Sequence, residues 1–365
     1  MRLLFDHHIF SWQQFGGVSK YFVKLIEHLR AANIECSLPY MFTNNYYIQS
    51  LTDNYSRHWQ VKGSYFAIES LNKINTLRIL RKHKFDIFHP TSTSNYFSHH
   101  IRSKPYVVTA HDLTIELFPQ YFKPWFAKRT VDERKQNYQY ASRIIAISEN
   151  TRNDLVKFYQ IDPDKIDVIY HGYSFDNGSA ERIRDLATSN DYLLYVGSRK
   201  EYKNFDNFLL ACSRVDNSIS IVCAGGGPFT DAETKAIHQA GMQGRINQYN
   251  VNNNELAYLY RKARMFVYPS LYEGFGMPVL EAFASECPVA LSDIPVFREI
   301  AGNAARYFSP YDPDSIQDCI ESILNNTSDS ETMKKLGAES IQKYRWELTA
   351  QKTINTYKKV IEQHT

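Results

Sequence analysis

Short apolar runs alternate with amphipathic stretches along this chain, and this alternation restricts the fold more than any other feature. In the first half the apolar runs are residues 3–5, 85–89, 106–110, 143–148 and 165–170. Such runs, separated by segments long enough for a helix, predict parallel strands in a sheet covered on both faces. The rhythm then restarts at residues 191–197, 218–227, 264–270, 287–292 and 305–309. We therefore predict an α/β protein with two parallel sheets.

A polar segment at residues 171–191 separates the two series and is interpreted as the linker, because it holds glycines, Asn and Asp without an apolar period. A chain of 365 residues also exceeds what one core usually holds. We predict two Rossmann-like domains, residues 1–172 and 173–345. Residues 346–365 are predicted to form a closing amphipathic helix, since their apolar side chains recur every three or four positions.

Charge and cysteine content exclude several classes of protein. The 42 Lys and Arg nearly balance 39 Asp and Glu, and a net charge of +3 argues against a general nucleic-acid binder. The five cysteines show no Cys-x-x-Cys and no histidine at ligand spacing, so we predict reduced thiols and a cytosolic chain. The opening MRLLFDHHIF is neither a signal peptide nor a membrane span.

One loop in the second half, LYEGFGMPVLEAF, combines an anion-binding backbone with two carboxylates. Gly274 and Gly276 let backbone amides approach a ligand, and Pro278 presets the first turn of a helix. Glu273 and Glu281 lie at either end, where a carboxylate accepts hydrogen bonds from hydroxyl groups. The alternative is that Glu281 only complements the helix dipole and Glu273 only belongs to a turn.

A second loop, SRKEYKN after the strand at 191–197, supplies cations. Arg199, Lys200 and Lys203 oppose the two glutamates, so the expected ligand has an anionic centre and hydroxyl-rich ends. A nucleoside diphosphate sugar has this chemistry. The alternative for each of the three basic residues is a solvated loop.

Two loops of the first half are further candidates. Gly16 and Gly17 precede an apolar-periodic helix, so their amides can meet a phosphate or an acceptor; a plain turn is the alternative. The pattern is not G-x-G-x-x-G, which disfavours a dinucleotide site. His111 and Asp112 follow the strand at 106–110, where a lone histidine is as often a hydrogen-bonded core residue as a functional one.

No residue pattern predicts a metal ion. The adjacent histidines at 7–8 and 99–100 have diverging side chains. The two Asp-x-Asp strings, 162–164 and 312–314, contain a central proline and are interpreted as turn chemistry. Without a metal, departure of a nucleoside diphosphate must be eased by Lys203, the amides and the helix dipole. We expect no cofactor beyond the nucleotide-sugar co-substrate.

The ordered series of motifs resembles glycosyltransferase family 4, the retaining glycosyl transferases group 1 of the GT-B fold. E-G-F-G-x-P-x-x-E resembles the family's E-x7-E motif. Over nearly the whole chain, further stretches resemble family blocks in the family's order: GGVSKYF, TAHDL, ISENTRNDL, VIYHG, YVGS with KN, AGGGP and CPVALSDIPVFREIAGNAA. The resemblance implies two domains facing across a cleft, the first holding the acceptor and the second the nucleotide sugar. It also implies that the closing helix at 346–365 crosses back and packs on the first domain.

The resemblance also implies roles for single residues. It implies that Glu281 binds the ribose hydroxyls, Glu273 the transferred sugar and Lys203 the diphosphate. Backbone N–H groups of Gly274, Phe275, Gly276 and Met277, before and at the turn that Pro278 presets, are implied to meet the sugar and phosphate. His111 is implied to contact the sugar, with Asp112 as an acceptor contact. Many members have Arg where this chain has Ser198, and Arg199 is the candidate substitute.

The implied reaction is transfer of a hexose onto a growing glycan or lipid-linked oligosaccharide with retention of configuration. The HDL, YVGS…KN and VFREIAG blocks look most like O-antigen and other polysaccharide mannosyltransferases of lipopolysaccharide biosynthesis. GDP-mannose is therefore the first choice of donor and a UDP-hexose the second. Base choice is expected to rest on loops such as 247–254. Retention has two routes, a covalent glycosyl-enzyme or a same-face displacement, and we favour the second.

Two other functions stay open on the same architecture. A sugar-nucleotide 2-epimerase would isomerise the donor without an acceptor, and a non-catalytic protein would bind the nucleotide sugar only. Basic and aromatic residues interleave at 71–85 and 121–135, so we also expect a peripheral contact with an anionic membrane at its cytoplasmic face. A solvated helix face is the alternative. In the first stretch, the expected apolar side consists of Leu71, Ile74, Leu77, Ile79 and Leu80.

Overall fold

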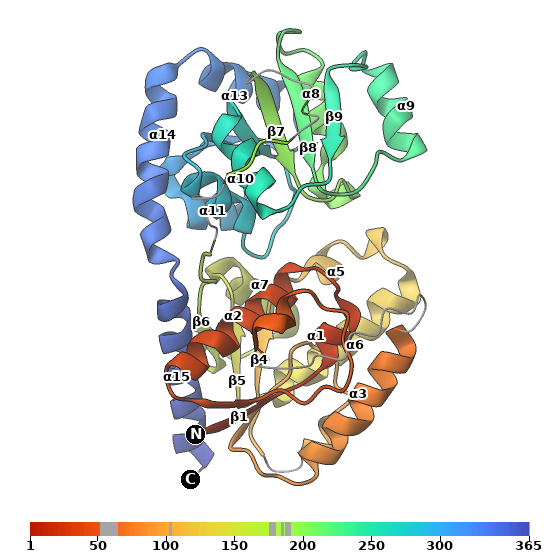
Figure 1. The fold of residues 1–365 in the computed structure, drawn as a ribbon, viewed down its shortest axis with the longest axis vertical. Helices are drawn as coiled ribbons and strands as arrows, with labels where there is room; N and C mark the ends of the chain where they lie inside the picture. Colours follow the sequence, from red (N-terminus) through yellow and green to blue (C-terminus); the bar gives the residue numbers. More distant parts are fainter. Residues whose placement is uncertain (52–64, 102–103, 175–179, 184–185, 187–190, 365) are drawn as a thin grey trace. The chain divides into compact units, whose positions relative to one another are not determined.

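The computed structural model describes residues 1–51, 65–101, 104–174, 180–183, 186 and 191–364 (Figure 1). Internal packing divides the chain into two units. Unit 1 comprises Met1–Gly172 together with Trp346–Thr365, and unit 2 comprises Tyr173–Arg345. Much of the segment that was interpreted as the linker lies outside the described residues.

Unit 2 is built on a parallel sheet whose strand order is β12-β11-β10-β7-β8-β9. Counted from β7, this is the order 3-2-1-4-5-6 of a doubly wound Rossmann sheet, which reverses direction between β7 and β10. The strands are β7 (Tyr192–Val196), β8 (Ser220–Ala224), β9 (Ile246–Tyr249), β10 (Met265–Tyr268), β11 (Val289–Ser292) and β12 (Arg306–Phe308).

Helices cover both faces of this sheet, which explains why its strands are continuous apolar runs. Leu193 and Tyr195 of β7 pack into one cluster with Phe208 of α8, while Phe266 of β10 packs against Tyr260 of α10. The helices of unit 2 are η4 (Glu201–Lys203), α8 (Phe205–Cys212), α9 (Asp231–Gln239), α10 (Asn253–Lys262), α11 (Met277–Ala284), α12 (Pro295–Ala301), η5 (Gly302–Ala304), α13 (Pro313–Leu324), α14 (Thr327–Ser340) and η6 (Ile341–Lys343).

Unit 1 has two sets of parallel strands, β2-β1-β3 and β4-β5-β6, joined by a bridge between Phe88 and Tyr106. The strands are β1 (Arg2–Phe5), β2 (Glu35–Ser37), β3 (Ile87–His89), β4 (Val107–Ala110), β5 (Arg143–Ala146) and β6 (Ile166–Val168). The helices are α1 (His8–Trp12), α2 (Gly17–Ala31), η1 (Tyr47–Leu51), α3 (Tyr65–Leu80), α4 (Ser98–Ile101), α5 (Thr114–Leu117), η2 (Pro119–Tyr121), α6 (Pro124–Tyr140), α7 (Glu149–Tyr159), η3 (Pro163–Lys165) and α15 (Trp346–His364).

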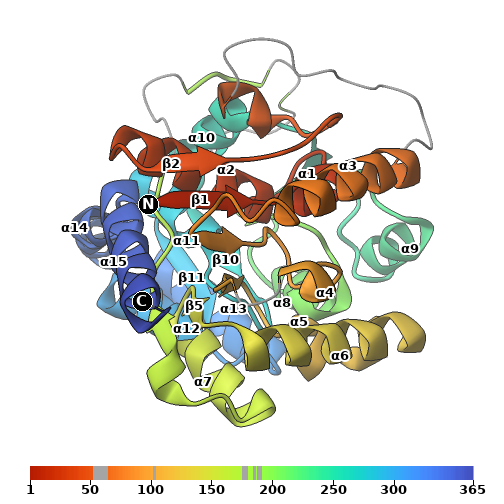
Figure 2. The same cartoon turned by 90° about the horizontal axis from the view of Figure 1, so that it is seen from below.

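Two separate apolar clusters fill unit 1, one on each face of its strands. The first contains residues of α2 and α15, and the second contains residues of α6 and α7. Figure 2 shows α2 and α6 on opposite sides of β1 and β5. The last helix is also tied to the strands by polar contacts, since Tyr357 Oη lies 2.6 Å from His89 Nδ1. Thus α15 belongs to the core of unit 1.

Apolar runs did not reveal two of the strands. β2 and β9 each lie at one edge of their sheet and have mainly half-buried or exposed side chains. An edge strand is covered less than a central one, so its sequence stays polar. The segment at 247–254, predicted as a loop, is in fact the end of β9, a short connection and the start of α10, where Asn252 forms a capping box with Glu255.

The predicted apolar side of α3 is correct only in part. Leu80 is buried, and Leu77 and Ile79 pack against the same apolar cluster, but Ile74 is exposed. The other buried positions of this helix are Ile68, Asn72 and Thr76. Asn72 Oδ1 accepts a hydrogen bond from the Met41 N–H at 2.7 Å, and its Nδ2 donates to Phe42 O at 2.7 Å. Asn72 is buried because it forms hydrogen bonds to the backbone of a neighbouring irregular segment. A count of apolar residues cannot detect such contacts.

Asp6, at the carboxyl end of β1, is a fully buried carboxylate that joins β1 to β3. It accepts hydrogen bonds from Thr91 N at 2.8 Å, Thr91 Oγ1 at 2.5 Å and Tyr96 Oη at 2.8 Å. We expect Asp6→Ala to lower the free energy of unfolding by about 3 kcal/mol, because several buried donors lose a charged acceptor. Urea titration measures this. The surface change Asp86→Ala is the control, with a loss below about 1 kcal/mol; equal losses would contradict the prediction.

Candidate active site

The loops after β7 and β10 meet at the point where the strand order of unit 2 reverses. Asn204 Nδ2 donates to Pro269 O at 3.0 Å, and Leu271 N donates to Tyr202 O at 2.9 Å, so the two loops are held together. Ligands of parallel α/β sheets bind outside the carboxyl ends of the strands at such a point. Asn204 belongs to the Lys-Asn pair of the motif series, but nothing in the sequence around it predicted that its side chain holds these loops together.

The loop after β10 leads into α11 through a turn that requires glycine. Gly276 is the N-cap residue, with φ +103°, and Pro278 occupies the first turn. A Cβ atom on Gly276 would lie 3.1 Å from Phe297 Cε1. Gly274 and Phe275 are buried, and Met277 begins the helix. N–H groups in the first turn lack intrahelical acceptors and carry the positive end of the helix dipole, so the turn suits an anion.

Gly276→Ala is expected to weaken nucleotide-sugar binding about tenfold, because the substituted turn must shift away from Phe297 and a left-handed backbone strains alanine. Calorimetric titration with the donor measures the change. Gly241 also has a positive φ, of +65°, but nothing lies within 4 Å of an added Cβ. Gly241→Ala should therefore leave donor affinity unchanged, and weakening by both variants would point to a global effect.

Glu273 and Lys203 come from the two loops and form an ion pair. Lys203 Nζ lies 2.5 Å from Glu273 Oε1, and the two side chains are only 15% and 13% exposed. Tyr268 at the end of β10 also bonds to this carboxylate; its pKa is raised far above the ordinary value by burial first, and then by the Glu273 charge. A cation and a carboxylate thus lie side by side at the carboxyl ends of β7 and β10. Their charges are poorly screened there, because both side chains are largely buried.

Glu281 lies in the second turn of α11 and is half-buried. Its Oε2 accepts a hydrogen bond from Tyr260 Oη of α10 at 3.3 Å. Burial, followed by the charge of Glu281, raises the pKa of Tyr260 well above its usual range, so the phenol stays a donor. Neither Tyr260 nor Tyr268 was singled out from the sequence, because buried tyrosines in apolar runs resemble core residues.

Arg199 has internal partners. Its Nε bonds to Glu233 Oε1 at 2.7 Å, its Nη1 to Gly225 O at 3.1 Å and its Nη2 to Gly227 O at 2.8 Å. The guanidinium therefore holds the glycine loop after β8. Ser198 accepts a hydrogen bond from Tyr195 Oη at its carbonyl oxygen, at 2.8 Å. Lys203, and not Arg199, is the cation that lies beside Glu273.

The candidates of the first half lie in unit 1. Gly16 is the N-cap of α2, and a Cβ there would lie 2.3 Å from Gln13 Oε1, which itself accepts from Ser19 N at 3.1 Å. Gly17 has open space around a Cβ position. Gly16 is therefore needed for the close approach of Gln13, which the sequence did not indicate.

His111 is packed by the rings of Tyr21 and His171, at centroid distances of 5.1 Å and 5.7 Å. Its Nε2 is buried and has no hydrogen-bond partner within the described residues. Burial lowers the pKa of His111 to about 3, so the imidazole is neutral at physiological pH. Asp112 Oδ1 accepts from Thr114 N at 3.0 Å and thus supports the start of α5.

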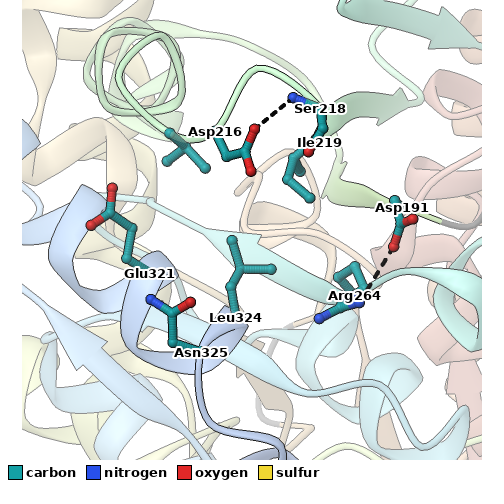
Figure 3. A pocket seen from close by; sticks show the side chains of 9 residues that line it. Asp191, Asp216, Ser218, Ile219, Arg264, Glu321, Leu324 and Asn325 are labelled. Carbon is teal, nitrogen blue, oxygen red and sulfur yellow. Dashed lines mark hydrogen bonds and ion pairs between the residues drawn. The ribbon is translucent and has the colours of Figure 1, made fainter.

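Among the described residues, no group of three or more His, Cys, Asp or Glu side chains is placed to hold a metal ion. Asp162 and Asp312 each accept a hydrogen bond from the backbone N–H two residues on; Asp162 caps the short helix η3, and Asp312 caps α13. A pocket of about 400 Å³ lies at the opposite end of the unit 2 strands, beside the residues where β7, β8 and β10 begin (Figure 3). Its Arg264 pairs with Asp191 at 3.3 Å. The strands separate it from the Lys203–Glu273 pair.

Two parallel α/β units, the second with a doubly wound sheet, have the architecture of the GT-B fold. Solved structures with this fold match nearly the whole chain. Sucrose-phosphate synthase from Thermosynechococcus elongatus matches with a TM-score of 0.76 and 17% identity over 99% of both chains. Anabaena HepE, solved in complex with UDP-glucose, matches with a TM-score of 0.74 and 15% identity over 98% of this chain and 100% of its own.

The family follows from sequence. The family described as "Glycosyl transferases group 1" matches residues 178–342, and "Glycosyltransferase Family 4" matches residues 15–177. The chain belongs to glycosyltransferase family 4, the glycosyl transferases group 1. It is 30% identical to the O-antigen chain mannosyltransferase RfbU of Salmonella typhimurium over 59% of this chain and 60% of the relative. It is 28% identical to the Escherichia coli O-antigen chain mannosyltransferase B over 76% of each chain. The first match spans less than two thirds of that relative.

Proposed function

We propose that this protein transfers a hexose, with mannose from GDP-mannose as first choice, onto a glycan or lipid-linked oligosaccharide acceptor of O-antigen or related polysaccharide synthesis. The observation that carries the proposal is the Lys203–Glu273 pair beside the α11 N-terminus. A diphosphate needs the cation and the amides, and a sugar needs the carboxylate. The likeness to two O-antigen mannosyltransferases supports the choice of mannose.

In the proposed reaction, Glu281 accepts hydrogen bonds from the ribose hydroxyls and Glu273 from the transferred sugar. Lys203 and the first turn of α11 stabilise the charge that grows on the leaving diphosphate, without a metal ion. The bond from the anomeric carbon to the phosphate oxygen breaks while the acceptor oxygen bonds from the same face. The acceptor proton moves to the leaving phosphate oxygen, and configuration is retained. A neutral His111 offers the sugar a hydrogen bond without placing a charge there.

Thermal shift of the full chain tests the donor. A ligand at 100 times its Kd stabilises the native state by about 2.7 kcal/mol. We expect GDP and GDP-mannose to raise the Tm, and UDP-glucose to raise it less. Glu281→Ala should abolish the shift. A shift with UDP-glucose alone would replace mannose by the UDP-hexose alternative, and no shift with any nucleotide sugar would remove the proposal.

Product analysis separates the remaining functions. NMR of the product should show the anomeric configuration of the donor. Isomerised donor formed without any acceptor would instead reveal a 2-epimerase, and binding without turnover would indicate a non-catalytic protein. A glycosylated side chain trapped on the protein would exclude the same-face displacement.

We further propose that the protein works at the cytoplasmic face of a membrane through a peripheral contact. Within the described part of the chain, no helix has the length and hydropathy to cross a bilayer. The surface we propose combines Phe66 and Ile74 of α3, both exposed, with Trp12 of α1, whose ring lies 5.8 Å from that of Phe66. Flotation with anionic vesicles at low salt should recover the protein, and Phe66→Ser should release it. An unbound wild-type chain would contradict the contact.

A further inference from the structure

One face of α6 lines a groove of about 360 Å³ in unit 1 that takes no part in the site described above. The helix contributes Trp125, Lys128, Arg129, Asp132, Glu133 and Gln136, and Asn95 comes from the segment between β3 and α4. The helix positions are three or four residues apart and therefore share one face. They extend over about 16 Å at 1.5 Å per residue, which is longer than a single hexose ring.

Trp125 presents the largest apolar surface in this groove. Its side chain is 65% exposed, whereas Ala127 and Tyr138 on the same helix are buried in unit 1. The neighbouring ring of Phe126 stands edge-on to the indole at 6.0 Å. The exposed indole is available to a ligand, and an indole face packs well against the C–H face of a pyranose.

The polar side chains along the groove can form hydrogen bonds with the hydroxyl groups of a sugar. Asn95 Nδ2 donates to Gln136 Oε1 at 2.5 Å, which orients the Gln136 amide and leaves its N–H groups for a ligand. Arg129 Nε bonds to Glu133 Oε1 at 2.9 Å. Lys128 and Asp132 have no hydrogen bond or ion pair to any described residue, so the groove offers a donor and an acceptor.

The charges along this face balance. Lys128 and Arg129 stand against Asp132 and Glu133, so a phosphate or an anionic membrane would meet as much repulsion as attraction. A neutral polyhydroxyl chain avoids that conflict. An aromatic platform with alternating donors and acceptors is suited to hexose rings.

The other side of α6 is fixed to the loop that carries His111 and Asp112. Arg134 Nη1 donates to Asp112 O at 3.1 Å and to Glu116 Oε2 at 2.7 Å. Arg134 is almost buried and Glu116 fully so, which makes the attachment rigid. The groove and the histidine therefore belong to one rigid part of unit 1.

We propose that this groove is a carbohydrate subsite that binds hexose units of the acceptor glycan away from its reacting end. The proposal rests on the proposed function in one respect, that the acceptor is a glycan. It adds a second point of attachment, which would let the enzyme favour long acceptors over short ones.

Ligand-observed NMR on the full chain tests the subsite with linear α-mannotetraose and maltotetraose as probes. At least one probe is expected to bind with a Kd in the millimolar range, and Trp125→Ala is expected to weaken it about tenfold. Tyr140→Ala is the matched control, because Tyr140 lies on the same helix with 76% exposure and does not line the groove. Its affinity should equal that of the wild type.

Three results would overturn the proposal: no binding of either probe, equal binding by wild type and Trp125→Ala, or equal losses in both variants. Loss of binding to anionic vesicles in Trp125→Ala, with oligosaccharide binding intact, would make this face a membrane surface instead. The donor-induced Tm shift, measured on the same variants, tests the proposed glycosyltransferase function separately from the glycan subsite. A groove that binds glycan in a chain that ignores all nucleotide sugars would refute the proposed function alone.

Discussion

Lys203→Ala is expected to lower kcat on the order of 10²–10³-fold, the range found when one group that stabilises developing charge is removed. Lys203 Nζ lies 2.5 Å from Glu273 Oε1 in surroundings where both side chains are largely buried. Charge on the leaving diphosphate grows towards the transition state, so the missing cation should lower kcat more than it raises KM. Steady-state kinetics with the donor identified by thermal shift measures both constants.

Lys200→Ala is the matched control for this experiment. Lys200 belongs to the same loop, three residues earlier, and is exposed. A solvated lysine contributes little, so kcat should stay within about twofold of the wild type. The Tm of both variants must be measured, since Lys203→Ala leaves Glu273 without its ion pair. Full turnover in Lys203→Ala, or an equal loss in Lys200→Ala, would remove Lys203 from the reaction.

Acid is expected to unfold this protein steeply between pH 6.5 and pH 4, because buried histidines stay neutral in the folded state. Burial lowers the pKa of His7 to about 4 and those of His89 and His111 to about 3. It also lowers the pKa of His171 well below its usual value. The unfolded chain takes up protons near pH 6.5. In the folded chain His7 takes up a proton only near pH 4, and His89 and His111 only near pH 3.

The sign follows from proton linkage. In this window the unfolded state binds more protons, so the free energy of unfolding falls as pH falls, by about 1.4 kcal/mol per pH unit for each histidine. Urea titrations at several pH values measure the slope. His89→Gln should reduce it by one proton. Thr109→Val is the control, because it removes the partner at 2.9 Å from His89 Nε2 but keeps the ring. It should lower stability without changing the slope, and an unchanged slope in His89→Gln would contradict the account.

The central strands and the ligand loops of unit 2 were predictable because their information is local. A strand covered on both faces must be apolar throughout, so the runs that became β7, β8, β10 and β11 stand out in the sequence. The turn before α11 needs a glycine at positive φ and tolerates proline in the first helical turn, and both requirements appear as residue types.

Partners distant in sequence were not predictable. Arg199 is a cation after a strand, and nothing in its neighbourhood indicates that Glu233 and the carbonyl groups of the glycine loop surround it. Asp6 precedes two histidines in the sequence and was not predicted to have a structural role, although it joins β1 to β3. The buried side of α3 includes polar residues, because Asn72 accepts hydrogen bonds from backbone groups about 30 residues away.

The order of residue types along the chain was sufficient to predict two parallel α/β units, because hydrophobic periodicity and glycine turns act over a few neighbouring positions. The ordered series of motifs indicated glycosyltransferase family 4. Folding decided the rest: which cation stands beside Glu273, which histidines lose their charge, and which face of α6 stays in water. Those outcomes depend on burial and on contacts between segments far apart in sequence. Such contacts form only when each unit folds.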